Sequence, residues 1–126
     1  EIGPLRTASL GDVAGIADGV LRRRARHVVT ENQRVLDAAE ALRAADLAGL
    51  GALLDEGHRS LRDDFEVSTP TVDATVERIR SMPGVHGVRL MGGGFGGCVV
   101  AVCEPGALDE GWLARPGPGA HLTSPT

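Results

Sequence analysis

The stretch VHGVRLMGGGFGGCVVAVC, residues 85–103, decides which fold this chain can adopt. Its first part, Val85–Met91, alternates well enough to predict a β-strand. Its last part, Cys98–Cys103, predicts a second strand that is apolar on both faces. Between the two, residues 92–97 hold five glycines and one phenylalanine. Two strands joined by so short a connection predict an antiparallel hairpin.

The glycine segment formally contains the dinucleotide-binding fingerprint G-x-G-x-x-G, with Gly92, Gly94 and Gly97 in the required positions. That fingerprint needs a helix directly after the loop, because the helix N-terminus meets the pyrophosphate. The β pattern of Cys98–Cys103 supplies no helix. The fingerprint also needs an acid on a following strand, whereas Asp109 lies among Pro and Gly. We therefore exclude a Rossmann-type site.

Five glycines are more than a plain turn requires, because each glycine costs backbone entropy on folding. Two interpretations of this loop stay open at this point. In the first, positive φ angles and free N–H groups let the loop lie against an anion such as phosphate. In the second, the loop is a hairpin that packs under another domain with Phe95 as its anchor. The residues concerned are Gly92, Gly93, Gly94, Phe95, Gly96 and Gly97.

Upstream of the hairpin, the first predicted helix runs from Leu21 to about Ala45. Its apolar stripe is formed by Val28, Val35 and Leu42, which repeat every seven residues. Four arginines within residues 22–26 crowd its start, where the helix dipole disfavours cations. Either the helix begins earlier or these arginines face acidic partners, and a solvated face is the simplest explanation.

Two further helices are predicted before the hairpin. Asp46 is the expected N-cap of the second, whose apolar stripe includes His58. We expect His58 to be a core or half-buried histidine rather than a catalytic one, because this helix places no catalytic partner beside it. The third helix is expected to be capped by Ser68 or Thr69, with its buried side formed by Val72, Val76 and Ile79.

These elements predict an α+β fold of about three helices packed on a small antiparallel sheet. We expect a linker or N-terminal extension at 1–20, with one helical turn after Ser9, a folded domain at 21–104, and a Pro/Gly-rich tail at 105–126. The chain opens with Glu1 rather than Met, which suggests that it continues something upstream.

Composition excludes several functional classes. The net charge of −4 and the shortage of aromatic residues weigh against a nucleic-acid partner. All 13 basic residues are Arg, so a P-loop lysine, a protein-kinase lysine and a Schiff-base lysine are all missing. No signal peptide or membrane-length apolar run is present. Cys98 and Cys103 have no metal-ligand spacing and are expected to be buried free thiols in the cytoplasm.

Three stretches closely resemble galactokinases, members of the GHMP kinase superfamily. They are RRRARHVVTENQRV at 22–35, HRSLRDDFEVS at 58–68 and RLMGGGFGGC at 89–98. Their order and spacing are similar to those of the family over roughly residues 5–104. The resemblance implies a GHMP-kinase C-terminal-like domain of an enzyme that phosphorylates galactose at its anomeric hydroxyl, using ATP with Mg²⁺. It assigns residues 92–97 to the glycine motif that closes on the phosphate loop of an N-terminal domain.

The same resemblance implies that galactose and ATP bind through an N-terminal domain missing from this chain. We therefore expect no catalytic residue, no metal site, no bound ATP or Mg²⁺ and no activity in these residues alone. The sequence departs from the family in Met91, where a Thr is usual, and in Thr71, where an acid is common. The segment 104–120 is also too short for the family's next helix and strand, which could leave the strand Cys98–Cys103 with an unpaired edge.

Three interpretations share this fold core. The chain can be the C-terminal part of a galactokinase, a non-catalytic galactokinase-like remnant, or a regulatory module that binds sugar and ATP.

Overall fold

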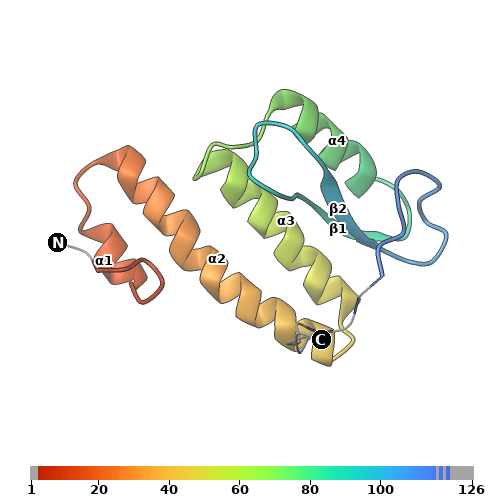
Figure 1. The fold of residues 1–126 in the computed structure, drawn as a ribbon, viewed down its shortest axis with the longest axis horizontal. Coiled ribbons are helices and arrows are strands. Elements are labelled where there is room, and N and C mark those ends of the chain that lie inside the picture. Colours follow the sequence, from red (N-terminus) through yellow and green to blue (C-terminus); the bar gives the residue numbers. More distant parts are fainter. Residues whose placement is uncertain (1–2, 116, 118, 120–126) are drawn as a thin grey trace, which may run out of the picture.

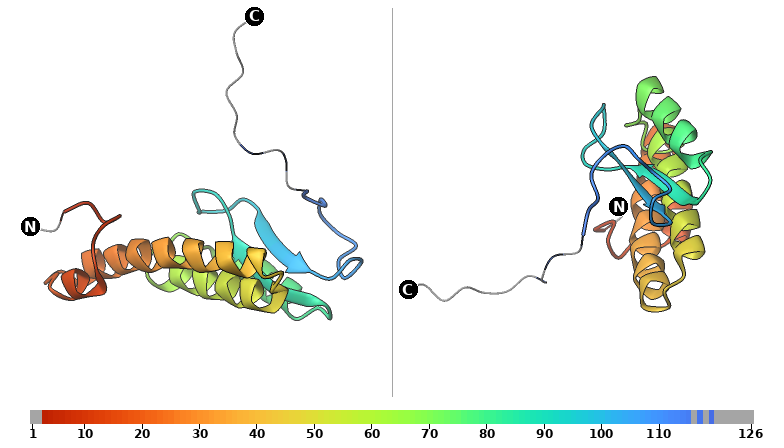
Figure 2. Two further views of the ribbon diagram at one scale, coloured as in Figure 1. Left: turned by 90° about the horizontal axis from the view of Figure 1, so that it is seen from below. Right: turned by 90° about the vertical axis from the view of Figure 1, so that its right-hand side faces the viewer.

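The computed structural model describes residues 3–115, 117 and 119, and over these residues the chain forms an α+β fold. Its elements are α1 (Leu10–Ala14), α2 (Gly19–Arg43), α3 (Leu47–Asp63), α4 (Pro70–Arg80), β1 (Val85–Leu90) and β2 (Val99–Cys103). The long helices α2 and α3 lie side by side, and the hairpin and α4 lie beyond α3 (Figure 1). Two further views show the hairpin on one side of the layer formed by α2 and α3 (Figure 2). The predicted fold class is confirmed; the three predicted helices are α2 to α4, and α1 is the expected turn after Ser9.

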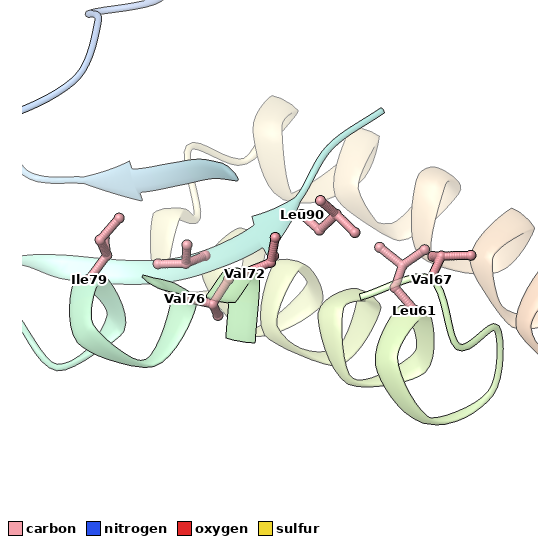
Figure 3. Packing of buried hydrophobic residues seen from close by; sticks show 7 residues of the cluster. Leu61, Val67, Val72, Val76, Ile79 and Leu90 are labelled. Carbon is pink, nitrogen blue, oxygen red and sulfur yellow. The ribbon is translucent and has the colours of Figure 1, made fainter. Parts of the chain in front are cut away.

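The core lies between α3, α4 and the hairpin. Val72, Val76 and Ile79 form the buried side of α4, as predicted, and they point toward β1 (Figure 3). Val88 and Leu90 of β1 are fully buried in the same cluster. The described core contains no Trp or Tyr, so small aliphatic side chains fill it.

The two strands pair in antiparallel fashion, as predicted, with Val88 opposite Ala101 and Leu90 opposite Val99. An irregularity between Val85 and Gly87 interrupts the register. Directly opposed residues of an antiparallel pair point to the same face. Val99 and Ala101 therefore share the core-facing side with Val88 and Leu90, and both pack against the core cluster.

Helix α3 touches β1 through two glycines. A Cβ added to Gly51 would lie 2.2 Å from the carbonyl oxygen of His86, and one added to Gly87 would lie 2.0 Å from the carbonyl oxygen of Gly51. The two backbones therefore approach more closely than any side chain would allow. This contact places α3 along the edge of β1 rather than beneath the sheet.

Both predicted caps of the later helices are present. The side chain of Asp46 accepts a hydrogen bond from the Gly49 N–H at the start of α3. Thr69, one of the two predicted candidates, caps α4, and Pro70 occupies its first turn.

The prediction for α2 was partly wrong. The helix begins at Gly19, where Asp18 caps it by accepting from the N–H groups of Val20 and Leu21. Val35 and Leu42 of the predicted apolar stripe are 61% and 63% exposed. Helix α2 packs against α3 and, near its start, against α1, and within the described residues the side chains of Val35 and Leu42 stay uncovered.

The expectation of two buried thiols was also wrong: Cys98 is exposed and Cys103 is half-buried. Cys98 lies outside β2, at the end of the glycine loop beside the exposed Met91, and Cys103 is the last residue of β2. Among the described residues, no helix is both long enough and apolar enough to cross a membrane.

Candidate functional site

The loop at residues 92–97 departs from ordinary backbone geometry over most of its length. Four of its glycines have positive φ angles: 84° at Gly92, 88° at Gly94, 132° at Gly96 and 94° at Gly97. Phe95 also has a positive φ of 60°. Residues with a Cβ rarely adopt this region, so glycine is needed where it recurs. The loop is therefore a specific conformation and not a flexible spacer.

This loop is held at its base and at its middle. At the base, the Met91 N–H donates to the Cys98 carbonyl oxygen at 3.1 Å. At the middle, the Phe95 N–H donates to the Val67 carbonyl oxygen at 2.7 Å. Gly94 packs directly on Val67, because a Cβ at Gly94 would lie 2.5 Å from the Val67 Cβ. The loop thus rests on the segment that connects α3 to α4.

The remaining amides of the loop point to no protein acceptor. Within the part of the chain that the structure describes, the N–H groups of five loop glycines make no hydrogen bond: Gly92, Gly93, Gly94, Gly96 and Gly97. The loop is at the surface, and Phe95 is 76% exposed. Backbone amides that point out of a loop can together bind an anion. The first of the two interpretations of the loop is therefore geometrically possible, and the exposed Phe95 ring is available to a further domain, as the second requires.

The segment that carries the loop is fixed in turn by the arginines at the start of α2. Arg23 pairs with Glu66 at 2.9 Å, and Arg24 pairs with the other oxygen of the same carboxylate. Arg26 pairs with Asp64, and Arg24 also donates to the Asp64 carbonyl oxygen. Hydrogen bonds from Arg24, and then from Arg23, hold the pKa of the Glu66 carboxyl below its usual value.

The simplest explanation for these arginines, a solvated face, was therefore incomplete. Arg23, Arg24 and Arg26 face acidic partners, whereas the exposed Arg22 donates to the Ile16 carbonyl oxygen at 3.0 Å, and the helix also begins earlier than predicted. Each of the two alternatives left open by the sequence is present.

A second link runs from β1 to α2. The Arg89 Nη1 donates to Glu31 Oε1 at 2.6 Å, and the Arg34 Nε donates to Glu31 Oε2 at 2.9 Å. Burial alone would raise the pKa of Glu31, but the hydrogen bonds from Arg89 and Arg34 outweigh it, so the pKa is lowered. Glu31 therefore stays ionised, and it ties the strand that leads into the loop to the long helix.

His58 is buried, as expected, and so is His27. His58 Nδ1 accepts the Leu90 N–H at 3.3 Å, and its Nε2 lies 3.2 Å from Asp73 Oδ1, outside hydrogen-bonding alignment. His27 Nδ1 is 2.9 Å from Ser60 Oγ, and its ring stacks on Phe65 with centroids 4.6 Å apart. Burial lowers the pKa of both imidazoles. Both rings are thus held neutral, between elements that position the loop.

All six residues predicted for the site lie together in this one loop. The sequence motifs did not reveal what supports it: the Val67 carbonyl group and the ion pairs of Asp64 and Glu66. The signal was available, since the arginine-rich run and the acidic run lie in two of the three stretches that carry the resemblance. Within the described residues, no three His, Cys, Asp or Glu side chains are grouped to hold a metal ion.

Comparison with known proteins places this geometry in context. Residues 38–115 match the family described as GHMP kinases C terminal. Among curated proteins, the chain is 52% identical over 94 residues to the galactokinase of Mannheimia succiniciproducens, which covers 74% of this chain and 24% of that protein. It is 49% identical over 106 residues to the human galactokinase, which covers 82% of this chain and 27% of that protein.

A solved structure agrees with the sequence matches. The crystal structure of Lactococcus lactis galactokinase complexed with galactose is 38% identical, with a TM-score of 0.76, over 82% of this chain and 28% of that chain. The chain thus spans about a quarter of the length of these relatives.

Proposed function

The chain belongs to the family of GHMP kinase C-terminal domains, and we propose that it is the C-terminal part of a galactokinase. Such an enzyme transfers a phosphoryl group from ATP to the anomeric hydroxyl of galactose. The similarity to galactokinases at about 50% identity supports this choice within the superfamily. So does the presence of all three stretches that resemble galactokinases.

One structural observation carries the proposal. The three stretches, far apart in sequence, meet at one place: three of the arginines of 22–26 hold the segment 63–68, and that segment holds the loop 92–97. The outermost layer of this assembly is a row of amide N–H groups with no acceptor among the described residues. We infer that the assembly presents these amides to the phosphates of ATP.

This role gives the loop a supporting part in phosphate binding. Amide donors can contact phosphate oxygens, but the arginines nearest to the loop's support are paired with acids. The chain has no lysine to hold the phosphates. ATP and galactose would therefore be bound mainly by an N-terminal domain, and these residues alone would be inactive.

Magnesium, like ATP and galactose, would be bound by the N-terminal domain. When bound with ATP, Mg²⁺ neutralises charge on the phosphates during phosphoryl transfer. The described residues offer no group of carboxylates for it. Its protein ligands would come from the N-terminal domain. We also propose a cytoplasmic location and no nucleic-acid or membrane partner for this chain.

A non-catalytic role is the second candidate, and two observations favour it. Met91 lies beside the glycine loop with 52% of its surface exposed, and a thioether cannot donate the hydrogen bond that a threonine hydroxyl would offer. The strand β2 has a neighbour on only one side within the described part of the chain. A remnant or a regulatory sugar- and ATP-binding module would tolerate both features.

Galactose-dependent ADP production tests the proposal. Residues 5–104 would replace the corresponding segment of the Lactococcus lactis galactokinase, and the chimera would be compared with the 126-residue chain alone. The proposal predicts turnover by the chimera only. A Gly94→Val chimera should lose turnover or raise the Michaelis constant for ATP, because the side chain would displace the loop from Val67.

Gly93→Ala in the chimera is the matched control for the fold of the loop, because its Cβ would meet nothing within 4 Å in this domain. Turnover by the isolated chain would contradict the proposal. A folded chimera without turnover would favour the non-catalytic candidate instead.

A further inference from the structure

Two polar side chains of α3 each connect β1 to α4. The first is Asp55, whose Oδ1 accepts the Val88 N–H at 3.0 Å and whose Oδ2 lies 2.9 Å from the Nε of Arg80, the last residue of α4. The second is His58, which follows three residues later on the same side of the helix. The two connections differ in where they lead, because only the second reaches the glycine loop.

The connection through His58 meets β1 at its last residue, next to the loop. His58 Nδ1 accepts the Leu90 N–H at 3.3 Å, so the proton of the neutral ring is on Nε2. Nε2 lies 3.2 Å from Oδ1 of Asp73, in the first turn of α4. His58 is 4% exposed, so this N–H faces a carboxylate with little screening by water. That attraction holds the two groups together, although they are not aligned as a hydrogen bond.

Asp73 continues the connection to the segment on which the loop rests. The Ser68 hydroxyl donates to Asp73 Oδ1 at 2.6 Å. Ser68 directly follows Val67, whose carbonyl oxygen accepts the Phe95 N–H at 2.7 Å. A closed path therefore runs from Leu90 through the buried imidazole and the carboxylate to the support of the loop's middle.

We propose that His58 and Asp73 are positioning residues for the glycine loop. They fix the end of β1, where the loop starts, relative to the segment 63–68, which supports its middle. Glycine by itself favours no single backbone conformation, so the arrangement of the loop amides depends on these two fixed points. The connection from Asp55 to Arg80 stabilises the fold without positioning the loop. The inference concerns how the loop is held, and its effect on ATP rests on the proposed function.

The tautomer of His58 gives this connection a pH dependence that an apolar contact would lack. A proton on Nδ1 would set two donors, this N–H and that of Leu90, against each other. Burial lowers the pKa of His58 below 6.5; of the charged groups around the ring, Asp73 on α4 favours protonation, whereas Arg62 on α3 and Arg89 on β1 oppose it. The bond to Leu90 should therefore be intact at neutral pH and be lost as the ring takes up a proton below pH 6.5.

Amide hydrogen exchange of the 126-residue chain, measured by NMR, tests the proposal. Asp73→Ala should speed exchange of the Phe95 amide at least about fivefold relative to the slowest amides, which report global unfolding. Asp55→Ala is the matched control: it should lower the free energy of unfolding but change the relative exchange of Phe95 by less than about twofold. Asp73→Asn keeps an Oδ1 acceptor for Ser68 and His58 and should restore slow exchange.

A second measurement follows the imidazole itself. Long-range ¹H–¹⁵N spectra should show the Nε2–H tautomer of His58 at about pH 7.5. Titration to about pH 5 should shift the Leu90 and Phe95 amide resonances with the same midpoint as the His58 ring. His58→Gln should abolish this shared titration, because the amide side chain does not ionise.

In the galactokinase chimera, Asp73→Ala should raise the Michaelis constant for ATP about fivefold and change that for galactose by less than about twofold. Faster Phe95 exchange without this kinetic change would support the positioning and contradict the proposed phosphate role of the loop. Equal Phe95 exchange in the Asp73→Ala and Asp55→Ala chains, or an Nδ1–H tautomer of His58, would overturn the proposal. If Asp73→Ala fails to fold, the titration of the unsubstituted chain decides: Phe95 must follow the His58 midpoint, and a Phe95 resonance that ignores it sinks the inference.

Discussion

The guanidinium of Arg89 on β1 reaches the carboxylate of Glu31 on α2 by crossing α3 at Gly57. The Arg89 Nη1 and Glu31 Oε1 are 2.6 Å apart, and a Cβ at Gly57 would lie 2.7 Å from the same Nη1. The side chains of Arg89 and Glu31 are only 21% and 23% exposed. The strand that leads into the glycine loop is thus tied to the long helix on the far side of α3.

Replacing Glu31 with Gln should lower the free energy of unfolding by about 1–3 kcal/mol, because Arg89 and Arg34 would then be partly desolvated without an opposing charge. Urea denaturation measures this change. Glu40→Gln on the same helix is the control, because its pair with Arg43 is 75% and 70% exposed and should contribute less than about 0.5 kcal/mol. Equal losses of unfolding free energy in the two variants would show that the link from Glu31 to β1 stabilises the fold no more than an exposed ion pair does.

Alanine at the two buried glycines of α3 should have unequal effects. At Gly51 the new methyl would overlap the backbone carbonyl of His86, so β1 would have to move, at a cost of about 3 kcal/mol or more. At Gly57 it would meet mainly the flexible end of Arg89, and the better helix propensity of Ala would offset about 1 kcal/mol of the cost. Thermal or urea unfolding should therefore rank Gly57→Ala well above Gly51→Ala in stability. The reverse order would contradict the packing of α3 against β1.

Within the glycine loop, Gly94→Ala should destabilise the chain by about 2–4 kcal/mol. Its φ of 88° is unfavourable for Ala, and its Cβ would overlap Val67. Gly93→Ala should change stability by no more than about 0.5–1 kcal/mol, since that residue has neither a positive φ nor a neighbour within 4 Å. If the loop packs on Val67, the two variants must differ in this way in their free energy of unfolding. Equal losses would show that the loop does not pack on Val67.

Acidification should destabilise the chain through its two buried histidines, His27 and His58. Burial lowers the pKa of His27 and His58 below the ordinary 6.5. As the pH falls, the unfolded chain therefore binds more protons at these histidines than the folded chain does. Stability from this source is complete above about pH 6.5 and falls as the pH drops below it. Urea midpoints between pH 7.5 and 5 should show the fall. His27→Gln should flatten the slope, even if it lowers stability at every pH, and an unchanged slope would rule out His27 as a contributor.

Much of this fold could be predicted from the sequence, because local signals and packing agree. Asp46 and Thr69 cap helices where their type and position indicate, and the valines of α4 recur with the helical period and are buried. The two strands and the loop were predictable because alternation, glycine and a short apolar run follow each other within 85–103.

The remaining features depend on what lies opposite each residue in space. The repeat of Val35 and Leu42 shows that α2 has an apolar face, but periodicity says nothing about whether a neighbour covers it. Three of the arginines of 22–26 pair with Asp64 and Glu66 about forty positions later, and this pairing is set by how α2 and α3 pack. Cys98 is exposed because it belongs to the end of the glycine loop and not to β2, although it extends the apolar pattern of that strand in the sequence.

The most direct test of the central claim is hydrogen–deuterium exchange of the peptide covering residues 91–98, measured by mass spectrometry with and without ATP and Mg²⁺. The measurement would use both the galactokinase chimera and the 126-residue chain alone. We predict slower exchange on ATP addition in the chimera, where the free amides of the loop would meet phosphate, and no change in the isolated chain. An active chimera whose loop exchanges at the same rate with and without ATP would contradict the account.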